Sequence, residues 1–274
     1  QLFIHSAEVK KELPKESDQF VGIDKDVKRI LADAYAKKIA LMYCTQEWVI
    51  PDLERVEKAL SVCEKALLDF MDSKRRAFPR FYFVAQNDLL DILSNGNNPS
   101  KVMIHMPKIF QAIDTLELKE DGDERPQAMG IHSSVGKEFV DFCEPLKLVN
   151  KVENYLDDVI NRMRLSIKTI AADSLKRFLV KEKRDWLEDD PAQVSLLVNL
   201  VNWVKNVEIA FKANAMAKAY DDQVVLLNDL IKMVQGELTT GMRQKIMCMI
   251  TMDAHSRDII EKLRDQGVTE IDDF

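Results

Sequence analysis

The sequence is poor in glycine, proline, cysteine and histidine. Its 274 residues include eight glycines, eight prolines, four cysteines and four histidines. So few turn-forming residues argue against a loop-rich β-sandwich, a collagen-like chain or a disordered linker. Four scattered cysteines without a C-x-x-C pair argue against a disulfide framework. With no apolar run near 18 residues and no signal-peptide pattern, the sequence predicts a soluble intracellular chain.

What is abundant favours helices. Hydrophobic residues make up 46% of the chain and charged residues 31%, with a net charge of −7. A mildly acidic chain gives no indication of a nucleic-acid partner or of a membrane partner. We therefore expect a mostly α fold, an elongated antiparallel helical bundle.

Apolar periodicity places most of the expected helices. Residues 1–22 are polar and broken by Pro14 and Gly22, so we expect the first helix to begin near residue 24 and run to 48. The next helix shows one apolar stripe at alternating steps of three and four residues, and Cys63 lies within it as a core thiol. That stripe consists of Leu53, Val56, Leu60, Cys63, Leu67 and Phe70. The other expected helices cover 88–93, 100–116, 152–186, 194–211, 220–238 and 242–265.

Residues 128–142 change to an alternating period, which predicts a β-hairpin inserted into the helical fold. These are the only strands that we expect. The turn would consist of Ser134, Val135, Gly136 and Lys137, directly after Ser133. An acidic surface loop is expected at 120–126.

Two local signals concern the helices that follow. Asp190 and Pro191 predict an N-cap and a first helical position, opening a helix that is apolar on nearly every face and should be buried on two sides. Gly241 should separate the last two helices.

No catalytic, cofactor or metal site is expected. Gly130 to Lys137 differs from a P-loop, because five residues separate the glycines and Glu138 stands where a magnesium-binding hydroxyl is needed. The histidines lack metal-ligand spacing. Around His255, Asp253 and Asp258 are better explained as packed or surface polar contacts than as a catalytic dyad.

The basic and aromatic segment at 74–83 has a composition suited to nucleic acid. A structural junction between helices is the favoured interpretation, with the arginines pairing acidic neighbours. The residues that we assign to this junction are Arg76, Phe78, Pro79, Arg80, Phe81 and Tyr82.

Three segments resemble dynein heavy-chain linkers, and the details look more like axonemal than cytoplasmic dyneins. The first is S-K-R-R-A-F-P-R-F-Y-F at 73–83, followed by D-L-L-D-I-L-S-N-G at 88–96. The others are D-P-A-Q-V at 190–194, and R-Q-K-I-M at 243–247 with D-A-H-S-R-D at 253–258. Tyr155 departs from the pattern, because many family members carry Trp there.

The resemblance implies a helical lever that joins the tail of a heavy chain to its ring of AAA+ modules, and that swings as the ring turns over ATP. Its partners would be the AAA+ ring and the tail of the same heavy chain, with the turn at 133–137 touching the ring. ATP and Mg would belong to the parent motor, and this segment would be non-catalytic, about half of a linker. The implied location is the cytoskeleton of the cytoplasm, in the axoneme of a cilium or flagellum.

The expected organisation has four parts: a polar segment at 1–22, a helical linker subdomain at 23–126, a β-hairpin insertion at 127–146, and a second helical subdomain at 147–274 that leads toward the first AAA+ module. The alternative is a stand-alone helical scaffold that binds partner proteins through 75–83 or the hairpin.

Overall fold

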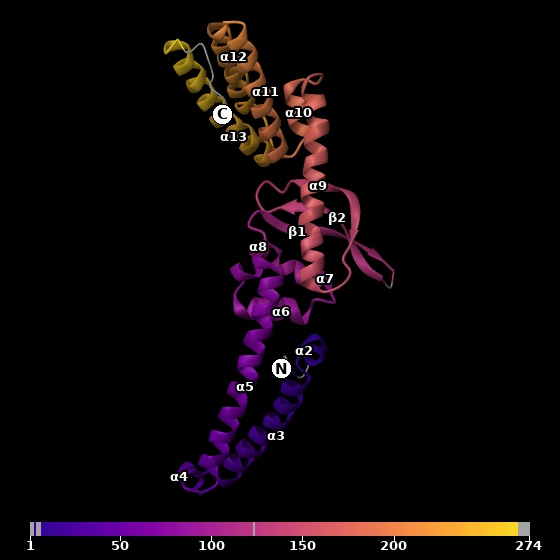
Figure 1. The fold of residues 1–274 in the computed structure, drawn as a ribbon, viewed down its shortest axis with the longest axis vertical. Coiled ribbons are helices and arrows are strands. Elements are labelled where there is room, and N and C mark those ends of the chain that lie inside the picture. Colours follow the sequence, from indigo (N-terminus) through magenta and orange to yellow (C-terminus); the bar gives the residue numbers. More distant parts are fainter. Residues whose placement is uncertain (1–2, 4–6, 123, 268–274) are drawn as a thin grey trace. The chain divides into compact units, whose positions relative to one another are not determined.

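The computed structural model describes residue 3 and residues 7–122 and 124–267 (Figure 1). The chain divides into two compact units. The first contains 1–111, 118–127 and 147–159, and the second contains 112–117, 128–146 and 160–274. Both units are mainly helical, and the sheet is three-stranded with the order β1-β2-β3. The expected mostly helical fold with an inserted hairpin is confirmed.

Helices of the amino-terminal half are mostly short, apart from two. They are α2 (Ala7–Glu12), α3 (Pro14–Lys37), α4 (Ala40–Cys44), α5 (Val49–Ala77), η1 (Pro79–Phe83), α6 (Gln86–Ser94), α7 (Pro99–Val102), η2 (Met103–His105) and α8 (Met106–Ile109). The strands are β1 (Ile113–Asp121), β2 (Glu124–Ser133) and β3 (Phe139–Lys147). The remaining helices are α9 (Val152–Phe178), α10 (Lys183–Asp189), α11 (Ala192–Lys212), α12 (Met216–Val234) and α13 (Thr240–Asp265).

The expectation that residues 1–22 form a segment broken by Pro14 and Gly22 is wrong for the residues of it that the structure describes. Helix α3 begins at Pro14 and continues through Gly22 to Lys37. Proline suits the first turn, where its missing N–H is not needed, and an isolated glycine is tolerated inside a helix at a modest cost. The helix then ends at Lys38, which has a left-handed backbone. Residues 1, 2 and 4–6 of the expected polar segment lie outside the described residues.

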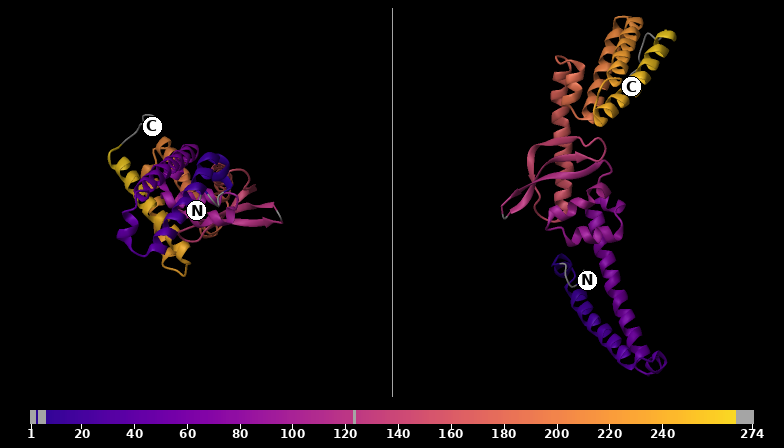
Figure 2. Two further views of the ribbon diagram at one scale, coloured as in Figure 1. Left: turned by 90° about the horizontal axis from the view of Figure 1, so that it is seen from below. Right: turned by 180° about the vertical axis from the view of Figure 1, so that it is seen from behind.

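Helices α3 and α5 run side by side in the first unit (Figures 1 and 2). Only part of the predicted α5 stripe is covered: Val56, Cys63 and Phe70 are buried, whereas Leu53 and Leu60 are exposed. The expected core position of Cys63 is confirmed. The residues of the stripe therefore lie on two neighbouring faces of α5. Only the face with Val56, Cys63 and Phe70 packs inside the unit.

The helix expected at 100–116 is wrong in its second half. Helix α8 ends at Ile109, the backbone is extended at Phe110, and Ile113 opens strand β1. Pairing with β2 decides this conformation, because strand propensity depends on neighbours that lie further along the chain. The expected acidic loop is a tight turn at Gly122, which has φ of +62°, between the ends of β1 and β2.

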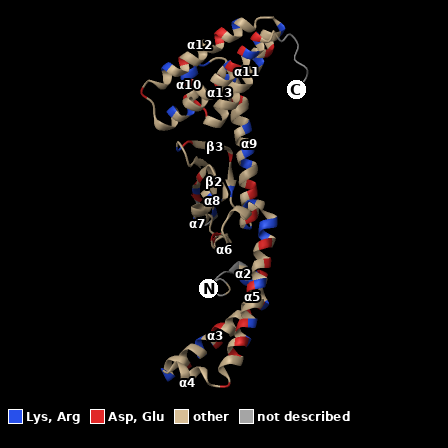
Figure 3. Ribbon diagram, turned by 90° about the vertical axis from the view of Figure 1, so that its left-hand side faces the viewer, with Lys and Arg blue, Asp and Glu red and all other residues tan. Residues whose placement is uncertain are grey.

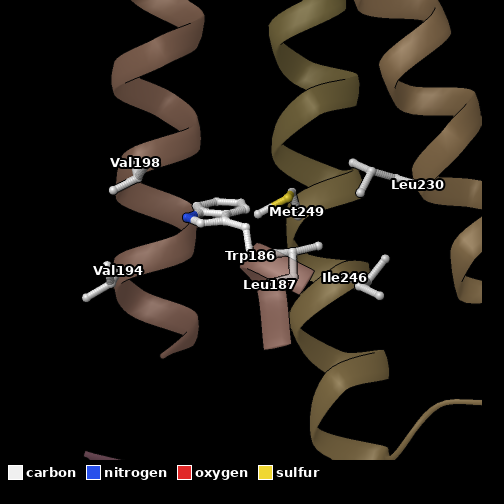
Figure 4. Packing of buried hydrophobic residues seen from close by; sticks show 7 residues of the cluster. All are labelled: Trp186, Leu187, Val194, Val198, Leu230, Ile246 and Met249. Atoms are coloured by element: carbon white, nitrogen blue, oxygen red, sulfur yellow. The ribbon is translucent and has the colours of Figure 1, made fainter. Parts of the chain in front are cut away.

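The second unit has a core built from α10 to α13. Trp186 and Leu187 of α10 pack among residues of the three longer helices (Figure 4). The buried members of this cluster are Trp186, Leu187, Val194, Val198, Leu230, Ile246 and Met249. The helix expected at 152–186 is instead two helices, because a turn at 179–182 lets Trp186 reach this core.

Helix α11 is apolar enough to meet a length and composition criterion for crossing a membrane, with a mean hydropathy of 1.2 in its best window. Core helices of soluble proteins meet the same criterion, and α11 supplies Val194 and Val198 to the core. The expectation that it is buried on two sides is wrong, because Leu197 and Val204 are exposed.

Candidate functional site

The loop between β2 and β3 is the predicted hairpin turn. Ser133 and Glu138 face each other across it, with the Ser133 N–H donating to the Glu138 carbonyl over 2.9 Å. The Ser133 hydroxyl donates to the Val135 carbonyl and accepts from the Glu138 N–H. Gly136 and Lys137 adopt positive φ values of 77° and 53°, conformations that close a tight turn and that glycine adopts without strain. The predicted hairpin is confirmed.

The loop backbone packs closely against the start of α13. A Cβ atom placed on Gly241 would lie 3.0 Å from the Gly136 carbonyl oxygen and 3.4 Å from its Cα. Gly241 thus lies inside the first turn of α13. The prediction that it separates the last two helices is wrong. Glycine is needed there because two backbones approach each other.

Glu138 connects the loop to a second helix. Its carboxylate accepts the backbone N–H of Ala192, the first residue of α11, over 3.1 Å to Oε1 and 3.2 Å to Oε2. The first N–H groups of a helix have no partner within the helix, and a carboxylate there also interacts favourably with the helix dipole. A residue of the hairpin therefore caps a helix that begins 54 residues later.

The predicted N-cap at Asp190 is wrong, because Glu138 caps α11 in its place. Pro191 occupies the N-cap position, and α11 begins one residue later than expected. The Asp190 carboxylate turns instead toward α9, where it accepts from the Ser174 hydroxyl over 2.6 Å and pairs with Arg177. Ser174 in turn accepts from the Trp186 indole N–H over 2.9 Å.

Lys245 of α13 joins the elements that meet here. Its side chain is only 7% exposed. Its ammonium donates to the carbonyls of Leu187 (2.9 Å) and Asp190 (2.6 Å), and lies 3.1 Å from Glu138 Oε1. Three donors thus meet three acceptors, which is what a buried ammonium requires. We call Gly136, Glu138, Asp190, Gly241 and Lys245 the hairpin junction.

The hairpin junction borders a cavity of about 330 Å³. The cavity is lined by acidic side chains of Glu188 and Asp189, together with Thr239 of the α13 N-cap. Within the described part of the chain, no group of three or more histidine, cysteine, aspartate or glutamate side chains could hold a metal ion. The geometry is that of a packing contact between a hairpin and helices.

Gly130 of the rejected P-loop comparison lies in β2. A Cβ there would come within 2.5 Å of the Val140 carbonyl oxygen and 2.6 Å of the Phe139 ring. Glycine is required at this position by the pairing of β2 with β3. The segment is strand–turn–strand, whereas a phosphate-binding loop joins a strand to a helix.

The residues assigned to the helix junction at 76–82 divide into two groups. Phe78 and Phe81 are buried edge to face, with centroids 4.9 Å apart, at the point where Pro79 opens η1. The Arg80 guanidinium lies over the Phe110 ring and donates to the Ile109 carbonyl. Arg76 and Tyr82 are exposed. Nearby, Lys74 forms a buried ion pair with Glu153 over 2.7 Å.

A polar chain crosses the second unit away from the hairpin. The Lys183 ammonium donates to the Asn199 side-chain oxygen (3.0 Å), and the Asn199 amide donates to the Asp253 carboxylate (2.7 Å). Burial raises the pKa of Asp253, although Lys183 and Asn199 oppose the rise. Burial also lowers the pKa of Lys183. The expected packed polar contact of Asp253 is confirmed, whereas Asp258 pairs with Arg257 and not with His255.

Comparison with known proteins identifies the family. Residues 1–174 match the family described as "Dynein heavy chain, N-terminal region 2". The chain belongs to the dynein heavy chains. It is 47% identical to the dynein alpha chain of the flagellar outer arm of Chlamydomonas reinhardtii, over 97% of this chain. It is 38% identical to the ciliary dynein beta chain of Heliocidaris crassispina over 94% of this chain, and 35% identical to human dynein axonemal heavy chain 9 over all of it.

These relatives are much longer than this dynein segment, which spans 6% of each. All three are named as flagellar, ciliary or axonemal chains, so the predicted axonemal type and the location in cilia or flagella are confirmed. Two of the motifs that carried the resemblance, at 190–194 and 243–247, contribute Asp190 and Lys245 to the hairpin junction.

The sequence of this dynein segment did not predict the roles of Glu138 and Lys245, which make the most contacts in the hairpin junction. In the sequence, Glu138 only argues against phosphate binding, and Lys245 is only one residue of the motif at 243–247. No local pattern could have paired them, because 107 residues of sequence separate the two side chains. The sequence offers Asp190 as a local cap beside Pro191, so nothing in it indicates that a distant residue caps α11.

Proposed function

We propose that this chain is a mechanical linker segment of an axonemal dynein heavy chain. It transmits the ATP-driven conformational change of the AAA+ ring to the tail, in microtubule-based motility. Family membership and the motifs of the linker support this proposal. The segment itself contributes no catalytic group, and ATP and Mg are bound by the AAA+ modules of the parent motor.

One observation supports a mechanical function most directly: Glu138 connects the hairpin loop to the start of α11 and to Lys245 of α13. A lever must move its parts together when one of them is pushed. The Glu138 side chain is 27% exposed, and its contacts are charge-assisted, which makes them stronger than hydrogen bonds between neutral groups. A displacement of the loop is therefore passed to two long helices without an intervening flexible segment.

The proposed partners are the AAA+ ring and the tail of the same heavy chain, with neither nucleic acid nor membrane. Within the loop, the segment Val135–Gly136–Lys137 is exposed, and Val135 is an apolar residue that is 68% exposed. We assign the ring contact to these residues, supported at its base by Ser133 and Ser134. The proposed organisation keeps the hairpin insertion at 127–146 between a helical subdomain that ends at 126 and one at 147–274, without a boundary at residue 22, where α3 is continuous.

The test uses the full-length heavy chain. Deleting 133–137 should slow microtubule gliding, and Val135→Asp, which keeps the hairpin intact, should slow it in the same direction. Val180→Asp is the control, since Val180 is 83% exposed in the turn before α10. Gliding and ATPase rates that equal those of the wild type in both hairpin variants would contradict the proposal. If gliding slows only in the deletion, the ring contact is wrong, and the loop acts by holding the hairpin junction together.

A further inference from the structure

A second face of helix α5 carries apolar side chains that the described residues of the first unit leave partly exposed. Ile50 is 60% exposed, Leu53 47% and Leu60 39%. Together with Glu54, Glu57 and Glu64 they line an open groove of about 620 Å³ that follows α5. The face that packs inside the unit adjoins this one and consists of Val56, Cys63 and Phe70, of which Val56 also borders the groove.

The spacing along this face fits another helix. Ile50, Leu53 and Leu60 stand at positions i, i+3 and i+10, and Glu57 and Glu64 occupy i+7 and i+14. These are successive positions of one helical seam, the arrangement by which one helix receives the apolar face of another. In chain order the seam reads apolar, apolar, acidic, apolar, acidic. Its complement therefore has basic positions opposite the two acidic ones and apolar positions opposite the rest.

The acidic positions have no cation of their own. Among the described residues, no hydrogen bond or ion pair reaches the carboxylates of Glu54, Glu57 or Glu64. Elsewhere on α5 the acidic side chains are paired: Asp52 binds Arg29 over 2.6 Å and Arg55 over 3.4 Å. Acidic residues recur along α5 in Figure 3. Three unpaired carboxylates beside exposed leucines and an isoleucine characterise the rim of an interface.

We propose that this face of α5 binds an amphipathic helix of the same heavy chain, from outside residues 1–274. That helix places lysine or arginine side chains opposite Glu57 and Glu64, and apolar side chains opposite Ile50, Leu53 and Leu60. Two observations favour an occupant within the same chain. The relatives extend far beyond this segment, which spans 6% of their length. A tethered helix also binds at a high effective concentration, so a short seam of three apolar anchors suffices.

The first experiment is carbodiimide crosslinking of the wild-type full-length heavy chain, which joins carboxylates to amines in direct contact. Peptide mass spectrometry should find Glu57 or Glu64 joined to a lysine outside 1–274. A mixture of isotope-labelled and unlabelled heavy chains shows whether that lysine lies in the same molecule. A crosslink to a co-purified polypeptide, or between two heavy chains, would overturn the proposal.

The second experiment also detects an arginine partner. Glu57→Lys/Glu64→Lys in the full-length chain should accelerate hydrogen–deuterium exchange of α5 peptides covering 50–64 by about tenfold, because like charges would face each other across the seam. Asp69→Lys is the control: it makes one such charge reversal, of +2 where the double variant makes +4, at an exposed α5 position outside the groove. Equal exchange in wild type, double variant and control, without a crosslink, would show that the face is solvated. This outcome is independent of whether the hairpin touches the ring.

Discussion

The Glu138 carboxylate accepts the backbone N–H of Ala192, so a hairpin residue completes the amino terminus of helix α11. The same carboxylate lies 3.1 Å from the buried ammonium of Lys245. The Glu138 carboxylate is thus both the cap of α11 and the counter-ion of Lys245. The hairpin cannot leave the helices without exposing a helix end and leaving a buried cation with one acceptor fewer.

Removing that group should destabilise the second unit. Glu138→Ala removes a cap, worth about 1 kcal/mol, and weakens the environment of a buried charge, so we expect a loss of roughly 2–3 kcal/mol in the free energy of unfolding. Urea unfolding measures it. The control is Glu144→Ala, which removes an exposed partner of Arg162 and should cost under about 1 kcal/mol. Equal losses in the two variants would mean that Glu138 acts as an ordinary surface charge.

Two glycines within helices should respond oppositely to alanine. At Gly241 the new methyl group would meet the Gly136 carbonyl oxygen at 3.0 Å. The loop must then shift, and we expect a loss of about 1–3 kcal/mol. At Gly22 nothing lies within 4 Å of the new atom, so alanine should stabilise α3 by about 0.5–1 kcal/mol. Thermal unfolding of both variants tests the pair, and a stabilising Gly241→Ala would rule out the close approach.

Neighbouring aromatic residues of the 73–83 motif should differ sharply. Phe81 is fully buried against Phe78, whereas Phe83, two residues later, is 84% exposed. Phe81→Ala should cost about 3–5 kcal/mol in the stability of the first unit. Phe83→Ala should change stability by no more than about 0.5 kcal/mol. Urea unfolding curves that shift equally for both would contradict the burial pattern of η1.

The Asp253 carboxyl should make stability depend on pH in a direction opposite to that of a surface ion pair. The pKa of Asp253 in the folded state lies above the ordinary value of 3.8 that it has in the unfolded state. At a pH between the unfolded-state pKa and the folded-state pKa, the folded chain therefore binds more protons than the unfolded one. Stability due to this group therefore falls as pH rises through that window. Asp253→Asn removes the titration and can keep a contact with Asn199.

The measurement is the difference in unfolding free energy between wild type and Asp253→Asn, followed upward from pH 4. Relative to the variant, the wild type should lose stability as pH rises. Other carboxyl groups, such as Asp52 and Asp88, have pKa values lowered by Arg29 and Lys108. They contribute equally to both proteins, and their effects cancel in the difference. A pH-independent difference would place Asp253 in contact with water.

Much of the local structure follows from short-range patterns in the sequence. Apolar periodicity predicted α12 within a few residues, because a helix that packs on others must repeat its apolar positions about every 3.6 residues. Alternation and the turn at 133–137 predicted the hairpin. Strand β1 was missed, since its conformation depends on β2, which supplies its hydrogen-bonding partners.

By itself the sequence determined most of the helical segments, where the hairpin turns, and through its motifs the family to which the chain belongs. These depend on neighbours a few residues apart. Only the tertiary structure decided that Glu138 caps α11, that Lys245 is buried beneath the hairpin, and that one apolar face of α5 is covered while the next is not. Hydrogen bonds and burial of this kind join residues far apart in the sequence, so their partners are chosen by packing and not by spacing.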